Sequence, residues 1–284
     1  YIFLSSNNIS QIFFIDNYNI PFFRTFVYEN SLIPIHPTYF SAFLLVSFTF
    51  SLFFNYNLIK KVKLYSLLNI LITTFFIFAF ISKIIFLTFI LTTLIYLVYR
   101  LIKKRKKYFK IFTLSFLALI TSIAFSFNGL IKERFNEIKT EINRPLKGDY
   151  HNSINIRVAI IKCSLKLLDK APVFGYGNDL QKELNGCFSN NYDSNFHQLH
   201  TYNTHNYYFN LLLFGGFFFL LLFLCFISFL LIKFKTSILY VMFVVQILLI
   251  NFTENFFSRH YGIVLFMYFI SLFLFFKKRD TIHQ

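Results

Sequence analysis

Charged residues are scarce in this chain of 284 residues. They make up 14% of the sequence, whereas hydrophobic residues make up 56% and phenylalanine alone occurs 45 times. Soluble domains carry about 25% charged residues. The balance therefore excludes an ordinary soluble domain and indicates a protein that crosses a bilayer several times.

Acidic residues are especially few: 12 Asp and Glu stand against 28 Lys and Arg, for a net charge of +16. Such an excess can indicate a nucleic-acid partner, and the placement of the charges decides whether this interpretation applies. The basic residues lie in short clusters between apolar blocks, as the positive-inside bias requires. No basic face interleaved with aromatic residues is present, so we expect no nucleic-acid binding.

Cysteine is also rare, and the three present set no disulfide framework. Cys225 lies inside an apolar run and is most simply a small buried hydrophobe. Cys163 and Cys187 could pair if their loop faces an oxidising compartment, but two cysteines are weak evidence and we favour free thiols. The chain begins at Tyr1 with no Met and no signal peptide, and an upstream truncation stays open.

Apolar blocks predict an all-α polytopic membrane protein with about seven visible transmembrane helices and one large external helical loop. An external N-terminal segment covers residues 1–37, and four spans fall within residues 38–127. The external loop covers residues 128–204, and residues 205–284 hold three spans and a short cytoplasmic tail. The predicted spans are residues 38–54, 64–81, 84–99, 111–127, 207–232, 237–252 and 261–276.

The second and third spans are separated only by a short polar step at Lys83. Read as one helix, residues 64–99 would be about 54 Å long at ~1.5 Å per residue. The hydrocarbon core of a bilayer is only about 30 Å thick. The chain must therefore reverse near Lys83.

Charge distribution orients the spans. Loops 55–63, 100–110, 233–235 and 277–284 together hold 15 Lys and Arg against one acid, whereas loop 128–204 holds 10 basic and 8 acidic residues. Every second loop is basic, so the basic loops are predicted to be cytoplasmic and the 128–204 loop external.

The external loop itself carries helical signals. Residues 153–170 place Ile154, Val158, Ile161, Leu165 and Leu168 on one amphipathic stripe. The sequence PVFGYG at residues 172–177 is predicted to be a glycine turn. Asp179 is placed to cap a second short helix over residues 180–184. The loop is thus predicted to be a small helical lid.

The spans themselves are nearly free of ionisable residues. Ion-coupled transporters and proton relays place such residues at bilayer depth, so their absence argues against a transporter. The ionisable residues instead collect at the external ends of the spans: Lys83, Arg157, His205, Glu254, Arg259 and His260. Cations there suit a diphosphate, and a histidine can act as a general base near neutral pH.

Four segments, in order, resemble those of the O-antigen ligase and polymerase (Wzy_C) superfamily over about residues 36–276. HNYYFNLLLFGGFFFLLLFL at residues 205–224 resembles its His-Asn signature. NIRVAIIKCSLKLLDKAPVFGYG at residues 155–177 resembles its arginine-containing helix and Gly-x-Gly turn. AFISKIIFLTF at residues 79–89 lies where the family often has Ser-Arg, and NFTENFFSRHYG at residues 251–262 resembles its Glu-Asn segment.

The resemblance implies a metal-independent, inverting glycosyltransferase of lipopolysaccharide biosynthesis in the cell envelope, with no cofactor. It would work on the periplasmic face of the bacterial inner membrane. The donor would be an undecaprenyl-diphosphate-linked glycan, and the acceptor would be lipid A core or another glycan. A Wzy-type polymerase, a non-catalytic polysaccharide exporter or flippase, and a catalytically dead truncated copy are the alternatives. Internal repeats would favour the exporter, and none is found.

The same resemblance assigns roles to residues. His205 would deprotonate or orient the acceptor hydroxyl, and Arg157 would bind the diphosphate and neutralise the leaving group. Lys83 takes the place of the family's Ser-Arg arginine, although it offers a point charge and not a planar fork. The other candidates for substrate binding are His200, Asn206, Glu254 and Arg259. The plainer readings are a span cap for His205, a solvated helix face for Arg157 and a snorkelling turn charge for Lys83.

Overall fold

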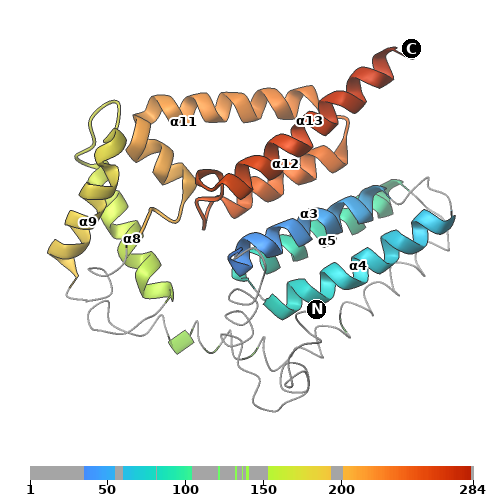
Figure 1. Cartoon of the computed structure of the whole chain (residues 1–284), viewed down its shortest axis with the longest axis horizontal. Coiled ribbons are helices and arrows are strands. Elements are labelled where there is room, and N and C mark those ends of the chain that lie inside the picture. The colour runs from blue at the N-terminus through green and yellow to red at the C-terminus, as the bar shows by residue number, and fades with distance from the viewer. Residues whose placement is uncertain are drawn as a thin grey trace. The chain divides into compact units, whose positions relative to one another are not determined.

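The computed structural model describes residues 35–54, 60–80, 82–103, 153–192 and 201–282, with a few single positions between 121 and 140. Within these residues the chain is helical and contains no strand. It divides into two units, Tyr1–Arg134 and Phe135–Gln284 (Figure 1). The all-α prediction is confirmed for the part of the chain that the structure describes.

Three apolar helices form the described part of the first unit: α3 (Pro37–Phe54), α4 (Lys60–Phe80) and α5 (Lys83–Lys103). The contacts that fix their directions are Phe40 with Phe80 and Ser51 with Ser66 between α3 and α4, and Phe48 with Phe89 and Phe53 with Tyr96 between α3 and α5. These pairs make α4 antiparallel and α5 parallel to α3. The chain therefore reverses between α4 and α5, where the excess length predicted a reversal.

Several polar side chains in these helices form hydrogen bonds inside the unit. The side-chain amide of Asn69 donates to Ser51 Oγ at 2.6 Å and to Ser47 Oγ at 3.0 Å. Thr49 donates to the carbonyl oxygen of Leu45, one turn back, at 2.8 Å. Lipid offers no hydrogen-bonding partner, so bonds of this kind are what lets polar residues sit in apolar helices.

One helix within the described ranges, Tyr207–Lys233, is long and apolar enough to cross a membrane. Five shorter apolar helices accompany it: Pro37–Phe53, Leu64–Phe80, Lys83–Tyr99, Ile238–Ile250 and His260–Phe275. These six coincide with predicted spans, but only Tyr207–Lys233 has both the length and the composition that a span requires. The span predicted over residues 111–127 lies outside the described residues.

The second unit begins, in its described part, with the paired helices α8 (Ser153–Leu168) and α9 (Leu180–Asn191), joined through the 3-10 turn η1 (Gly177–Asp179). Their shared core also takes in one residue of a later helix, Leu213. The core residues are Ile156, Ala159, Ile160, Cys163, Leu167, Leu180, Leu184, Phe188, Tyr192 and Leu213. The helix predicted over residues 153–170 is confirmed, and α9 runs well beyond residue 184.

Two local details of this lid differ from the prediction. The face of α8 that packs against α9 holds Ile160 and Cys163, whereas Ile161 and Leu165 of the predicted stripe are exposed. Asp179 precedes α9 but makes no side-chain cap, because it has right-handed helical φ and ψ as part of η1. A capping side chain needs the extended backbone that lets its oxygen turn back onto the helix.

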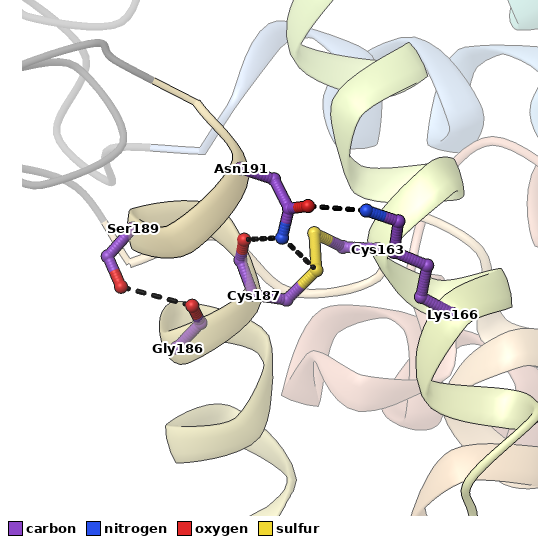
Figure 2. The surroundings of a disulfide bond; sticks show 6 residues. All are labelled: Cys163, Lys166, Gly186, Cys187, Ser189 and Asn191. Carbon is purple, nitrogen blue, oxygen red and sulfur yellow. Dashed lines mark hydrogen bonds between the residues drawn. A yellow bond between two sulfur atoms is a disulfide. The ribbon is translucent and has the colours of Figure 1, made fainter.

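Cys163 and Cys187 form a disulfide that joins α8 to α9, so the expectation of free thiols is wrong (Figure 2). The two helices bring the Cα atoms of the cysteines to 5.8 Å, a separation that suits a disulfide. Beside it, the Asn191 amide donates to Cys187 O at 2.7 Å and its oxygen accepts from Lys166 Nζ. Such bonds persist in oxidising compartments, in keeping with the external placement predicted for this loop.

Three further helices complete the unit: α11 (Tyr207–Lys233), α12 (Ile238–Ile250) and α13 (His260–Ile282), with the 3-10 turn η2 (Phe256–Ser258) before α13. The side chain of Cys225 is exposed on α11, which contradicts its prediction as a buried residue. Much of the α11 surface is apolar and exposed in the same way, as lipid-facing surface is.

The apolar run predicted to be one unbroken span is broken at Gly216, which has φ 68° and ψ −169°. Figure 1 shows α11 turning there from a short first segment into a long second one. The break frees the carbonyl of Leu213 from the helix ladder, and the backbone N–H of Tyr176 donates to it at 2.7 Å. The predicted glycine turn at residues 172–177 thus docks into the break of α11.

This docking, which we call the glycine contact, depends on two residues without a side chain. A Cβ on Gly216 would lie 2.0 Å from Val173 O, and a Cβ on Gly175 would lie 2.6 Å from Leu213 O. Both glycines have positive φ, which residues with a Cβ adopt only at a cost. The glycine contact is therefore made by backbone atoms alone.

Candidate functional site

The loop that enters α11 is ordered by a helix cap. Asn206 is the N-cap residue, and its side-chain oxygen accepts from Tyr208 N at 3.0 Å and from Phe209 N at 3.1 Å. Its amide group donates to Phe252 O at 3.1 Å. These bonds use both ends of the Asn206 side chain, so the residue predicted to bind substrate has a structural role in this arrangement.

The same loop is tied to the segment that follows α12. The hydroxyl of Thr204 lies 2.9 Å from Asn206 O and accepts from the amide of Asn255 at 3.0 Å. The backbone N–H of Tyr207 donates to Asn251 O at 2.9 Å. We call this set of bonds the polar anchor; its members are Thr204, Asn206, Asn251 and Asn255. It brings residues 204–207 against residues 251–255.

His205 lies between these tied residues in a left-handed backbone conformation, with φ 42°. Its N–H donates to Asn203 Oδ1 at 2.9 Å. Residues other than glycine seldom adopt this backbone conformation. Those that do occur often at functional sites, where the surrounding hydrogen bonds hold them in place. The polar anchor on both sides of His205 supplies those bonds.

Glu254 joins the two residues to which the sequence assigns chemistry. Its Oε1 accepts from Arg157 Nη2 at 2.9 Å, and its Oε2 lies 3.5 Å from His205 Nδ1. The carboxylate side chain is 7% exposed, against 36% for Arg157 and 30% for His205. A buried carboxylate thus holds a cation and an imidazole that are both open to solvent.

The three residues reach this point from three elements. Arg157 is in the second turn of α8, His205 precedes α11, and Glu254 follows α12. The position of Arg157 depends on the disulfide-linked pair α8 and α9 and on the glycine contact. The positions of His205 and Glu254 depend on the polar anchor. The cluster therefore lies where the lid and the apolar helices meet.

The His205 imidazole turns its Nδ1 atom toward the Glu254 carboxylate. Its Nδ1 is buried and lies 3.5 Å from Glu254 Oε2, within ion-pair distance but without a hydrogen bond. A proton on Nδ1 would leave Nε2 with a free lone pair.

The other predicted site residues lie away from this cluster or outside the described residues. Lys83 begins α5 in the first unit, whereas the cluster belongs wholly to the second unit. Arg259 is exposed at the end of η2, and the His260 ring lies tilted beside the Tyr261 ring, with centroids 3.7 Å apart. His200 lies outside the described residues. Among the residues that are described, no three His, Cys, Asp or Glu are grouped to hold a metal ion.

Sequence reasoning missed the residues that position the cluster. Thr204 and Asn255 are buried and bonded to each other, and each is the chain neighbour of a cluster residue. The ring of Tyr202 lies 6.4 Å from that of His205, and burial raises the pKa of Tyr202 to about 12. Tyr202 is therefore a neutral phenol beside the imidazole at neutral pH. The Asn that precedes an apolar run is the one signal that would have identified the cap.

Together, the apolar helices and the ionisable cluster at their ends are compatible with a membrane protein that has a polar site next to its helical lid. The family described as O-antigen ligase (Wzy_C) matches residues 67–224, more than half of the chain. The chain belongs to this family of bacterial membrane proteins of the ligase and polymerase type, which confirms the resemblance found in the sequence. No curated protein and no solved structure matches the chain. The matched range contains Arg157 and His205, and Glu254 lies beyond it.

Proposed function

We propose that the protein is an O-antigen ligase-like glycosyltransferase at the periplasmic face of the bacterial inner membrane. It moves a glycan from an undecaprenyl-diphosphate carrier to an acceptor hydroxyl, of lipid A core or of another glycan. Membership of the family supports a ligase or polymerase type of reaction. The observation that carries the assignment of residues is the Glu254 carboxylate, which contacts Arg157 with one oxygen and faces His205 with the other.

His205 is the base in this proposal. The acceptor hydroxyl attacks the anomeric carbon while Nε2 takes its proton, and the bond from that carbon to the diphosphate oxygen breaks. Glu254 keeps the Nδ1 proton in place and stabilises the imidazolium that forms, as a carboxylate behind a catalytic histidine does. Attack opposite to the leaving group inverts the configuration of the sugar.

Arg157 binds the diphosphate. Glu254 accepts from only one of its terminal nitrogens, and a guanidinium has five N–H donors in a planar fork. The remaining donors can bond to diphosphate oxygens while the ion pair holds the side chain in position. The charge that develops on the leaving diphosphate is then stabilised by a cation already in place.

The test uses the full-length protein in liposomes with the undecaprenyl-diphosphate-linked glycan, a chelator, and each acceptor supplied separately. We expect His205→Ala to lower the rate of transfer by roughly 10²- to 10⁴-fold, whereas His260→Ala, which removes an exposed histidine outside the cluster, should retain it. Transfer to lipid A core identifies a ligase, and lengthening of the donor glycan identifies a polymerase. Full activity of His205→Ala would remove His205 from the mechanism.

Glu254→Gln tests the link between the two residues. The amide keeps the shape but lacks the charge that fixes the imidazole and pairs with Arg157, so we expect kcat to fall by roughly 10²-fold, the scale of a general-base contribution. Because Glu254 acts through His205, the double variant with His205→Ala should lose little beyond His205→Ala alone. Losses that multiply would show that Glu254 acts independently.

Arg157→Ala should mainly raise the KM for the diphosphate-linked donor, since it removes donors to the diphosphate. Arg157→Lys keeps the charge without the fork and should recover part of the loss. Lys166→Ala, on the same helix but bonded to Asn191, is the matched control. An unchanged dependence on donor concentration in Arg157→Ala would contradict the assigned role.

A further inference from the structure

The lid carries its most exposed apolar side chains on the turn that docks into α11. Val173 is 81% exposed and Phe174 is 75% exposed, the two highest values among the large hydrophobic residues in the described part of the chain. The turn is also uncharged: from Ala171 to Asn178 the sequence reads APVFGYGN. Exposed apolar side chains on an uncharged tip are typical of a contact surface.

The turn is continuous with the apolar surface of α11. Val173 O and Phe174 Cα lie within van der Waals reach of a Cβ built on Gly216. The next two residues of α11 are Phe217, 68% exposed, and Phe218, 53% exposed. The exposed side chains of the turn therefore lie beside the start of the long second segment of α11, which is apolar and exposed along its length.

The length of that segment sets the height of the turn. Residues 217–233 form about 26 Å of helix at ~1.5 Å per residue, and Lys233 marks the basic end predicted to be cytoplasmic. A hydrocarbon core of about 30 Å therefore reaches from Lys233 past Gly216. With Lys233 at the cytoplasmic boundary and this segment along the membrane normal, the turn lies near the boundary between acyl chains and headgroups on the lid side.

The backbone N–H groups on both sides of Val173 and Phe174 are either absent or paired. Pro172 has no N–H, Gly175 N donates to Pro172 O at 2.8 Å, and Tyr176 N donates to Leu213 O at 2.7 Å. An unpaired backbone group is costly in an apolar medium. The positions that flank Val173 and Phe174 therefore present no free N–H donor to lipid.

We propose that the turn at residues 172–175 is a membrane anchor, whose Val173 and Phe174 side chains enter the leaflet on the lid side. The anchor would fix the height of α8, which ends four residues before it, and with it the height of Arg157 above the bilayer. The proposal rests on the membrane character of the family and on the glycine contact, and it is independent of the transfer chemistry.

The 284-residue sequence contains no tryptophan, so Phe174→Trp introduces its single indole at the tip of the turn. The full chain carrying it is placed in phosphatidylethanolamine and phosphatidylglycerol liposomes, with and without lipids brominated on the acyl chains. We expect the indole of the Phe174→Trp variant to emit at shorter wavelength than a hydrated indole. It should also be quenched several-fold more strongly by brominated lipid than by aqueous iodide.

Two matched variants calibrate the measurement. Asn190→Trp places the indole on an exposed position of α9 and gives the response of a hydrated lid residue, whereas Phe229→Trp on α11 gives that of a lipid-facing residue. A response of Phe174→Trp like that of Phe229→Trp supports the anchor. Quenching by iodide equal to that of Asn190→Trp, with no response to brominated lipid, would overturn it. Neither measurement involves glycan transfer, so failure of the anchor and failure of the proposed function are separate results.

Discussion

The two ends of the first segment of α11, residues 207–215, are fixed in opposite ways. At its beginning, the polar anchor uses side chains: Thr204 and Asn206 bond to Asn255 and to the backbone of Phe252. At its end, the glycine contact uses backbone only, because neither Gly175 nor Gly216 has room for a Cβ.

The difference determines how each end tolerates change. A hydrogen bond contributes about 1 kcal/mol net, so the polar anchor can lose one bond and keep the others. The glycine contact cannot be weakened in small steps, because any Cβ on Gly175 or Gly216 must displace backbone atoms of the facing segment. The end of this segment next to His205 therefore tolerates single substitutions, and the end that contacts the lid does not.

Gly216→Ala should give the largest effect, because it breaks the glycine contact. The new Cβ meets Val173 O at 2.0 Å and the backbone has φ 68°, so we expect a loss of about 3 kcal/mol in the free energy of unfolding. Gly186→Ala is the control, since a Cβ there meets nothing within 4 Å. Thermal unfolding of both purified variants compares them, and equal stability would show that the contact yields easily.

Thr204→Val should have an intermediate effect on the polar anchor. The substitution keeps the shape but leaves the buried Asn255 amide without the hydroxyl that accepts from it at 3.0 Å, which costs about 1–3 kcal/mol. Thr201→Val, at an exposed position, should change stability by less than about 0.5 kcal/mol. If the two variants unfold at the same temperature, the Thr204 bonds do not hold the loop.

Asn206→Ala should give the smallest change in stability, about 1 kcal/mol for a lost N-cap. Asn206→Asp retains the side-chain oxygen that accepts from Tyr208 N and Phe209 N, and should recover most of that loss. Glycan transfer measured on the same samples tests the substrate-binding role predicted for Asn206. A variant as stable as the natural protein but with a raised substrate KM would restore that role.

Much of the fold could be predicted because its signals are local. The helices coincide with apolar runs, and the reversal at Lys83 follows from the length of residues 64–99 against a bilayer. The break of α11 could not be predicted, because glycines inside an apolar run are common in membrane helices. Only the docking of the turn at residues 172–177, distant in sequence, requires Gly216 to leave the helix.

The candidate site also divides into residues that the sequence identifies and contacts that only tertiary packing determines. Arg157, His205 and Glu254 could each be singled out, because ionisable residues at the ends of apolar runs are few. Their meeting could not be predicted, since Arg157 and Glu254 are 97 positions apart and their approach depends on tertiary packing. Pairing of the cysteines was missed for the same reason, because it depends on how α8 packs on α9.

The bond between Cys163 and Cys187 also sets an order of events in the making of this protein. Two thiols give up two electrons only where an oxidant reaches them, and the cytosol keeps thiols reduced. With the external placement proposed for this loop, the chain released by the ribosome still holds two thiols. The bond between α8 and α9 then forms only after the loop has been transferred to an oxidising compartment.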